Sequence, residues 1–598
     1  MNTVTALRIW DLRRGDDDDN RTSPHGGGLR RLLLSAALEL NYLKAAIAFL
    51  ILIVGPALVV GIAPSIAVTY GLLKFDAVVS AGYSPIVALA ILSLPLLFAF
   101  WIARPLLAKA VENFWHLHYT LIVPVFVAAR EILRSVAESF PGATCTREQI
   151  ERRRRLGTIL GALLFAGAGL ALSMTMGLST GLQLVDLEHV RVWAVVKAAL
   201  GNAALIFGLS TAAESLYWVW RELRLSGPVL DWAPSSMQPE GSISRVAHLS
   251  DLHFVGERYG YRMESGTDGP RGNLCIRNAL RKTAAIHAST PLDHILVTGD
   301  VTDAGTRAEW TEFLDYFRNC PELRAHVSFV PGNHDVNIVD RSNASRFDLP
   351  WSARQSLRKL RVVLAMDALQ GDRSYLVDRA SGTLGPSLKD YLREGRRAEL
   401  LRELAQDGSP RGRREMAKVW DAIFPLVEPA PDDRGYGLIL LNSNARSHFA
   451  LTNAIGVVNP PQLKALKSIL RGNPHNAWMI LLHHHVVEYP AVSTGLIDRI
   501  GLALVNAPDL LAAIAPYASR CLVLHGHRHH DWIGSSRGVM LCSAPSVTMG
   551  SQDEGKYRGS FHIHELAIGD GSIRLIATER VKVAQALSPA LSHPRIFT

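Results

Sequence analysis

The 598-residue sequence contains little cysteine and no closely spaced cysteine pair. Its five cysteines are an odd number, lie far apart and form no Cys-x-x-Cys motif. Secreted disulfide scaffolds and thiolate zinc sites need such patterns, so we expect neither, and a reducing compartment is the natural environment. Charged residues are also scarce, at 20% of the chain against 48% hydrophobic residues. This composition excludes a disordered chain and, with a mean hydropathy of +0.13, indicates a membrane part.

Charge is absent from long stretches of the first 225 residues. Uncharged runs cover residues 45–73, 77–103 and 156–185, and a fourth apolar stretch covers 192–220. A helix needs about 20 apolar residues to cross a bilayer core of about 30 Å. We therefore expect three or four transmembrane helices, the first two joined by a tight hairpin between the charged residues 74 and 76. A signal peptide has a shorter apolar run nearer its start, so the first run should stay in the mature protein.

Basic residues lie mostly on one side of these runs. They are dense before residue 45 and between residues 104 and 155, whereas the opposite side has only Lys74 and Arg191. The positive-inside tendency then places the N-terminus and, with four spans, everything after Arg221 in the cytoplasm. An odd number of spans would reverse the last assignment. We expect an integral protein of the bacterial inner membrane in contact with the lipid bilayer, and Gly157-x-x-x-Gly161 and Gly177-x-x-x-Gly181 leave self-association open.

Five short apolar runs of the remaining chain end in polar clusters. Alternating with helix-like stretches, they predict an α/β fold whose strands carry polar groups at their carboxyl ends, where such sheets place their sites. The clusters that follow these runs are Asp251-Leu-His253, Gly299-Asp300-Val-Thr-Asp303, Pro331-Gly-Asn333-His334-Asp335, His483-His484-His485 and His525-Gly-His527-Arg-His529. In Asp-x-His and His-x-His, alternate residues of an extended segment point the same way, so both can reach one metal ion. Carboxylate, amide and imidazole ligands without thiolate suit manganese, iron or zinc.

The ordered set of five blocks resembles the calcineurin-like metallophosphoesterases, over about residues 244–580. The resemblance implies a four-layer αββα sandwich around two mixed sheets, preceded by an all-α transmembrane region. It also implies a site with two divalent or trivalent ions. One ion would be held by Asp251, His253 and His529, and the other by Asn333, His483 and His527, with Asp300 bridging the two. His484 is the alternative to His483, because the family's usual pattern after this strand is absent. His334 would face the phosphate as a proton donor or transition-state stabiliser, with Asp303 as its orienting partner.

The resemblance implies hydrolysis of phosphodiester bonds by a metal-bridging hydroxide. Residues 298–310 look like the class III cyclic-nucleotide phosphodiesterase branch, so cyclic nucleotides are candidate substrates. A phospholipid or nucleotide-linked lipid is the alternative substrate, and a non-catalytic binding scaffold is a third hypothesis. No nucleic-acid partner is expected, because the basic residues cluster around the spans.

The predicted domains follow from these patterns. They are a basic cytoplasmic tail (1–44), a membrane region (45–224), a Gly, Pro and Ser-rich linker (225–244), the metallophosphoesterase domain (245–580) with an insertion at about 339–435, and a C-terminal tail (581–598). The Arg and Glu-rich part of the insertion, residues 392–414, is expected to form amphipathic helices. These would be a cap over the site, a partner surface or a solvated face.

Overall fold

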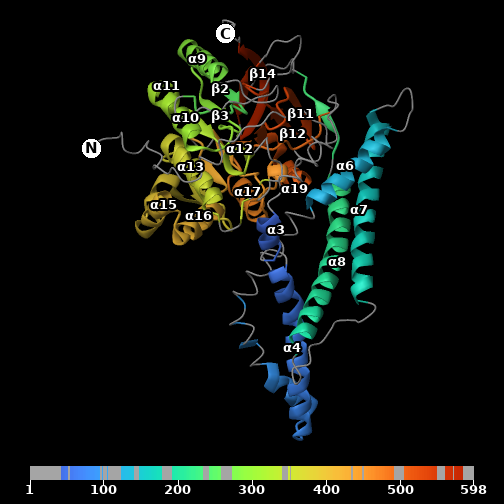
Figure 1. Ribbon diagram of the computed structural model, residues 1–598. Helices are drawn as coiled ribbons and strands as arrows, with labels where there is room; N and C mark the ends of the chain where they lie inside the picture. The colour runs from blue at the N-terminus through green and yellow to red at the C-terminus, as the bar shows by residue number, and fades with distance from the viewer. Residues whose placement is uncertain are drawn as a thin grey trace, which may run out of the picture. The chain divides into compact units, whose positions relative to one another are not determined.

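The computed structural model describes most of the chain outside its two ends (Figure 1). The described residues are 42–50, 54–93, 97–98, 101, 104, 123–139, 147–177, 191–225, 227–233, 241–257, 273–339, 346, 348–349, 352–431, 435–447, 450–489, 504–548, 559–569 and 571–583. The expected tails at 1–44 and 581–598 fall largely outside these residues. The chain divides into two compact units, one containing Leu40–Arg224 and the other containing the chain from Leu225 onward.

The first unit consists of helices. They are α3 (Tyr42–Phe49), α4 (Gly55–Ser80), α6 (Val123–Ser139), α7 (Arg147–Gly177) and α8 (Val192–Leu225). Within the described part of this unit, three segments are long and apolar enough to cross a membrane: Leu58–Ser80, Gln149–Thr175 and Val192–Leu225. Of the four expected spans, the second, at 77–103, lies partly outside the described residues.

The hairpin expected at residues 74–76 is misplaced. Helix α4 continues through Lys74 and Asp76 and ends at Ser80, and the turn follows at Ala81 and Gly82. Gly82 has φ +89°, a conformation that side chains rarely adopt, so glycine sets the end of this helix. Lys74 and Asp76 did not mark the turn, because charged side chains are compatible with a helical backbone and the conformation that ends the helix is supplied by Gly82.

Small residues of α7 pack against α6 within the same chain. A Cβ at Gly157 would lie 2.7 Å from the Cα of Arg134, and one at Gly161 would lie 3.0 Å from the Cα of Arg130. Glu222 on α8 accepts hydrogen bonds from both of these arginines. The Gly157-x-x-x-Gly161 face is therefore occupied by α6 and is not open to a second copy of the chain. The other motif, Gly177-x-x-x-Gly181, ends outside the described residues.

The second unit is built on two mixed sheets. The nine-stranded sheet has the order β1-β11-β12-β10-β9-β8-β7-β5-β6, and the five-stranded sheet has the order β14-β13-β2-β3-β4. The strands of the larger sheet are β1 (Val229–Asp231), β5 (Tyr375–Val377), β6 (Leu384–Ser387), β7 (Leu426–Glu428), β8 (Tyr436–Leu440), β9 (Ala477–Leu481), β10 (Cys521–His525), β11 (Trp532–Ser536) and β12 (Val539–Ser543). Those of the smaller sheet are β2 (Ser242–Leu249), β3 (His294–Val297), β4 (Val327–Phe329), β13 (Gly559–Gly569) and β14 (Ser572–Val583).

The longer helices of this unit follow the sheet strands along the chain. They are α9 (Leu274–Ser289), α10 (Arg307–Asn319), α13 (Ala353–Gln370), α15 (Gly395–Asp407), α16 (Pro410–Ile423), α17 (Pro460–Gly472) and α19 (Ala507–Ile514). Their starts follow local sequence signals. Thr306 and Glu309 form a capping box at α10, and Asn459 caps α17 just before Pro460.

Alternate residues of the central strands face two different cores. In β9, Met479 and Leu481 belong to a core shared with the smaller sheet and with α9 and α10, whereas Trp478 and Ile480 pack in a second core with α17 and α19. The larger sheet thus lies between the smaller sheet and a helical layer, with further helices on the smaller sheet. The α/β class and the two mixed sheets are as the sequence predicted.

Two segments differ from their expected form. The linker expected at 225–244 contributes β1, which pairs antiparallel with β11 through Val229 to Asp231. The expected insertion at 339–435 contributes β5, β6 and β7, which extend the larger sheet beyond β8. Its Arg and Glu-rich part forms the helices α15 and α16, with Leu404 and Met416 buried. Both segments are therefore integrated into the sheet.

Candidate metal centre

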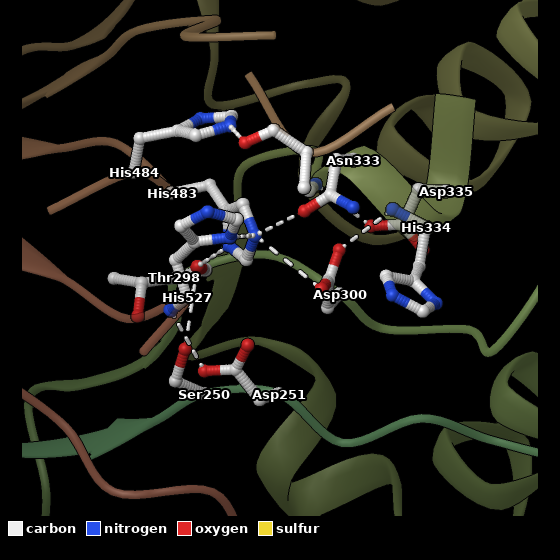
Figure 2. Close-up of polar contacts among 12 residues, drawn as sticks. Ser250, Asp251, Thr298, Asp300, Asn333, His334, Asp335, His483, His484 and His527 are labelled. Carbon is white, nitrogen blue, oxygen red and sulfur yellow. Dashed lines mark hydrogen bonds and ion pairs between the residues drawn. The ribbon is translucent and has the colours of Figure 1, made fainter. Parts of the chain in front are cut away.

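Five loops at the carboxyl ends of strands bring the predicted residues together. Strands β2, β3 and β4 are parallel neighbours, as are β9 and β10, so their ends meet at one edge of each sheet. The loops supply, in chain order, Asp251 and His253, Asp300 and Asp303, Asn333 and His334, His483, and His527 and His529. Figure 2 shows Asp300, Asn333, His483 and His527, which come from four of these loops, close to one another.

The backbone is strained where the side chains turn toward this centre. Among the described residues, six that are not glycine have a positive φ, and five of them are predicted metal ligands. The five are Asp251 (φ 52°), His253 (49°), Asp300 (47°), His527 (74°) and His529 (56°). Such a conformation costs about 1–3 kcal/mol per residue and persists where surrounding structure enforces it. Five such residues in one site indicate that the fold accepts an unfavourable backbone conformation in order to direct these side chains toward the centre.

One group of the site joins the first and last loops. Asp251 Oδ1 lies 3.3 Å from His529 Nε2, and its other oxygen accepts a hydrogen bond from the His527 backbone N–H at 3.1 Å. Asp251, His253 and His529 together present ligand atoms that all lie within 4.8 Å of one another. These are the three residues predicted to hold one ion.

A second group joins the loops after β3, β4, β9 and β10. His483 Nε2 lies 3.0 Å from Asn333 Oδ1, 3.0 Å from His527 Nδ1 and 3.3 Å from Asp300 Oδ2. Its Nδ1 lies 2.9 Å from the Thr298 carbonyl oxygen and donates a hydrogen bond to it. Burial lowers the pKa of this ring, but Asp300 and Asp251 raise it to about 9. Nε2 then faces oxygen and nitrogen lone pairs, an arrangement that a shared cation or an added proton stabilises.

Asp300 lies between the two groups. Besides its 3.3 Å approach to His483, its Oδ2 lies 3.9 Å from His253 Nε2. Its Oδ1 accepts a hydrogen bond of 2.8 Å from the backbone N–H of His334. One carboxylate is thus within reach of ligands from both predicted sets.

The buried atoms of the site fit metal binding. Nε2 of His253 and Nε2 of His527 are buried and have no hydrogen-bond partner. Leaving such a group unsatisfied costs about 1–3 kcal/mol, and more for a charged one. Because these unpartnered imidazole nitrogens lie beside the carboxylates of Asp251 and Asp300, the residues fit manganese, iron or zinc.

Electrostatics keep the carboxylates ionised. Burial raises the pKa of Asp300, but His483, His334 and His253 together lower it by more than burial raises it. The pKa of this carboxyl is therefore well below its usual range. Burial also raises the pKa of Asp251, but His529 and His483 together lower it by more, so the pKa lies below its usual value. Burial and neighbouring histidines hold the pKa of His527 well below its ordinary value, so this ring is neutral and can donate a lone pair.

His334 and Asp303 are in contact, but not as expected. His334 Nδ1 lies 2.7 Å from the backbone carbonyl oxygen of Asp303 and 3.8 Å from the carboxylate Oδ1. That carboxylate oxygen is closer to Nδ1 of His253, at 3.3 Å. The main chain of Asp303 therefore holds the His334 ring, while its carboxylate lies beside a predicted metal ligand. The His334 side chain is 17% exposed, more than the buried ligands around it.

His484, the alternative to His483, is turned away from the other ligands (Figure 2). Its Nδ1 lies 2.8 Å from the Ser443 hydroxyl and its Nε2 lies 3.2 Å from the Ala454 carbonyl oxygen. Because both ring nitrogens are used, this residue has no lone pair for a metal. The geometry favours His483.

Other residues hold the loops in place and were missed in the sequence. The buried Asp335 carboxylate accepts hydrogen bonds from the backbone N–H groups of Val301, Thr302 and Gly332, which ties two ligand loops together. The hydroxyls of Ser546 and Thr548 donate to the Asp251 carbonyl oxygen. Asp335 stands inside a recognised block, but nothing in the sequence marks Ser546 or Thr548.

Comparisons with known proteins agree with this site. Two curated relatives match parts of the chain: the "Probable cyclic nucleotide phosphodiesterase" of Coxiella burnetii is 30% identical over 103 residues, and the "3',5'-cyclic adenosine monophosphate phosphodiesterase CpdA" of Haemophilus influenzae is 27% identical over 139 residues. They cover 17% and 22% of this chain, which spans 36% and 47% of their own lengths. The chain thus matches less than half of either relative.

A solved structure was also matched. It is a dimetal phosphatase from Danio rerio, 13% identical, with a TM-score of 0.32, and the match covers 58% of this chain and 100% of that one. The model of the family described as calcineurin-like phosphoesterase matches residues 244–531, which include every predicted ligand. Residues 244–531 are therefore similar to the calcineurin-like phosphoesterases, the family that the five sequence blocks also resemble.

Proposed function

We propose that this protein is a membrane-anchored phosphodiesterase that uses two metal ions, with cyclic nucleotides as its substrate class. The observation that carries the proposal is the position of Asp300 between two groups of converging ligands, one with Asp251 and one with His483. A single carboxylate within reach of both groups is the arrangement that a dinuclear centre requires. The family match and the two relatives named as cyclic nucleotide phosphodiesterases support the substrate class.

The metal ligands divide as follows in this proposal. Asp251, His253 and His529 hold one ion, Asn333, His483 and His527 hold the other, and Asp300 contacts both. When bound, two such ions neutralise charge on the phosphoryl group and supply hydroxide near neutral pH. Metal analysis of the purified protein distinguishes manganese, iron and zinc.

His334 acts on the substrate in this mechanism. Its Nδ1–H donates to the Asp303 carbonyl oxygen, which fixes the ring and leaves proton exchange with the substrate to Nε2. A protonated Nε2 next to the phosphate would stabilise the charge that develops there and protonate the leaving oxygen. A positioned acid of this kind contributes about 10²–10⁴-fold to a rate.

The helical unit serves as the anchor. The three described helices that are long and apolar enough to span a bilayer support insertion, and the basic residues before residue 45 support a cytoplasmic N-terminus. With four spans the domain after Leu225 is cytoplasmic as well. A reporter enzyme fused after residue 598 tests this, because alkaline phosphatase is active outside the inner membrane and green fluorescent protein fluoresces inside it. Phosphatase activity would contradict the proposed orientation.

A lipid substrate is the second candidate. Three long apolar helices are more than a simple tether needs, and they would keep the hydrolase next to anionic phospholipids or nucleotide-linked lipids. Release of product from lipid in mixed micelles, without turnover of cyclic nucleotides, would favour this candidate.

A substrate panel distinguishes the two. Full-length protein in detergent is loaded with Mn²⁺ and assayed on cyclic AMP, cyclic GMP, bis(p-nitrophenyl) phosphate, phosphomonoesters and a nucleotide-linked lipid. We expect turnover of the cyclic nucleotides, lost in both Asp300→Ala and His334→Ala. A folded protein that binds two ions and hydrolyses no diester would contradict the proposal. It would favour the hypothesis of a non-catalytic binding scaffold.

A further inference from the structure

A second histidine cluster lies in the smaller sheet, apart from the residues assigned above. His248 is on β2, and His562 and His564 are on β13. In the antiparallel pair of these strands, His562 is directly opposite His248, and His564 follows two positions later. Side chains two residues apart on a strand share a face, so the register places all three imidazoles on the same side of the sheet. Each of these histidines is at most 1% exposed.

One nitrogen of each ring is held from outside the cluster. His248 Nε2 lies 3.0 Å from the Thr298 hydroxyl, His564 Nδ1 lies 2.9 Å from the Thr578 hydroxyl, and His562 Nε2 lies 2.9 Å from Oδ1 of Asp531. The other oxygen of Asp531 pairs with Arg580 at 3.1 Å. Outer partners of this kind orient the histidine ligands of metal sites and fix their tautomers.

The other three ring nitrogens are His248 Nδ1, His564 Nε2 and His562 Nδ1. His248 Nδ1 lies 3.2 Å from His564 Nε2, and His562 Nδ1 is buried without any hydrogen-bond partner. One ring nitrogen from each residue lies within 4.8 Å of one from each of the others. Since the Asp531 carboxylate can only accept, it accepts the hydrogen bond of the His562 Nε2–H group, and the neutral ring then carries its lone pair on Nδ1. Burying that lone pair unsatisfied costs about 1–3 kcal/mol.

We propose that His248, His562 and His564 bind a further divalent transition-metal ion, of which Zn²⁺ fits best. Three neutral imidazoles without carboxylate or thiolate suit zinc and similar late metals and do not suit Mg²⁺ or Ca²⁺. Burial and neighbouring histidines hold the pKa values of His248 and His564 well below the ordinary value, so both rings are available as neutral ligands. The carboxylate behind His562 offsets part of the charge of a buried dication.

The ion would fasten β13 to β2, the strand that leads into Asp251 and His253. Its role is therefore structural: it holds the start of the first ligand loop and does not touch the substrate. Because the three ligands are buried, the ion should exchange slowly and survive dialysis that removes weakly bound metal.

Metal counting tests the proposal. Full-length protein in detergent is saturated with Zn²⁺, dialysed and analysed for zinc per chain by mass spectrometry. The variants are His562→Gln, which keeps a donor toward Asp531, and His564→Asn, which keeps one toward Thr578. The matched control is His326→Asn, outside both clusters, where Nδ1 lies 3.1 Å from the Asp293 carbonyl oxygen. We expect one ion fewer in each cluster variant, a lower unfolding temperature, and no change in the control.

Equal zinc in the wild type and in folded cluster variants would overturn the proposal. Should both variants fail to fold, the Asp300→Ala, His483→Ala double variant tests the proposal instead. It removes ligands of the proposed two-ion site and leaves His248, His562 and His564 unchanged. X-ray absorption of its retained zinc should then show three histidine ligands, and a folded double variant without zinc would overturn the proposal.

Discussion

His483 Nε2 lies 3.0 Å from Asn333 Oδ1, although 150 residues separate the two in the chain. Each follows directly on a buried strand, β9 and β4, and the two strands belong to different sheets. The contact therefore depends on how the sheets face each other, which the shared core fixes. It brings an amide oxygen and an imidazole nitrogen to the same side of Asp300.

The choice between His483 and His484 can be tested directly. His483→Asn should lose at least one metal ion per chain, because it removes the nitrogen that faces Asn333 and Asp300. His484→Asn should keep the wild-type metal content, since this ring bonds only to Ser443 and Ala454 in the described contacts. Mass spectrometry of metal per chain decides. A loss of metal in His484→Asn alone would reverse the assignment.

His334→Gln should separate catalysis from metal binding. We expect kcat on a phosphodiester to fall about 10²-fold or more while the metal content stays the same, because His334 is proposed to act on the substrate and not on the ions. Steady-state kinetics and metal analysis of the same preparation measure both. An unchanged kcat would remove His334 from the mechanism.

Gly299→Ala should lower activity by displacing the His483 ring. A Cβ at Gly299 would lie 2.5 Å from His483 Nδ1, and φ at this position is +92°. We expect a loss of activity of at least about 10-fold, because a displacement of about 1 Å in a site can cost 10² in rate. Gly472→Ala is the control, since its Cβ would meet only the Ser381 carbonyl oxygen at 3.8 Å. Wild-type activity in Gly299→Ala would mean that the loop tolerates the shift.

Lys359 predicts a pH dependence of stability. Its ammonium lies 5.2 Å from the Trp420 ring centroid, and burial followed by Arg446 lowers its pKa from 10.5 to about 7. Between these values the unfolded chain binds more protons than the folded one. The free energy of unfolding should therefore fall as the pH drops from about 10 to 7 and level off below. Lys359→Met has no group that titrates here and should not lose stability as the pH drops. Its unfolding temperature should therefore exceed that of the wild type by about 2 °C or more at pH 7 and by less at pH 10. Equal differences at both pH values would contradict the shift.

The sequence was sufficient to find the five ligand blocks. Each block directly follows a short apolar strand, so Asp251, Asp300, Asn333, His483 and His527 could be placed at strand ends without a structure. The α/β class followed from the same alternation.

Other features depend on pairing between distant segments. His248 and His564 are 316 residues apart, and only the register of β2 with β13 brings them together. Single histidines inside strand patterns carry no local signature of such a cluster. Strand β1 was missed for a similar reason, because three residues in a proline-rich segment form a strand only where β11 offers an unpaired edge.

Metal-dependent hydrolysis of bis(p-nitrophenyl) phosphate tests the central claim most directly. The full-length protein is stripped with a chelator, reloaded with Mn²⁺ and assayed beside Asp300→Asn, which preserves the shape of the bridging side chain and removes its charge. We predict that stripping abolishes turnover, that Mn²⁺ restores it, and that Asp300→Asn stays at least about 100-fold slower at saturating Mn²⁺. Turnover by the stripped protein, or full activity of Asp300→Asn, would contradict the claim that this site works through two ions joined by Asp300.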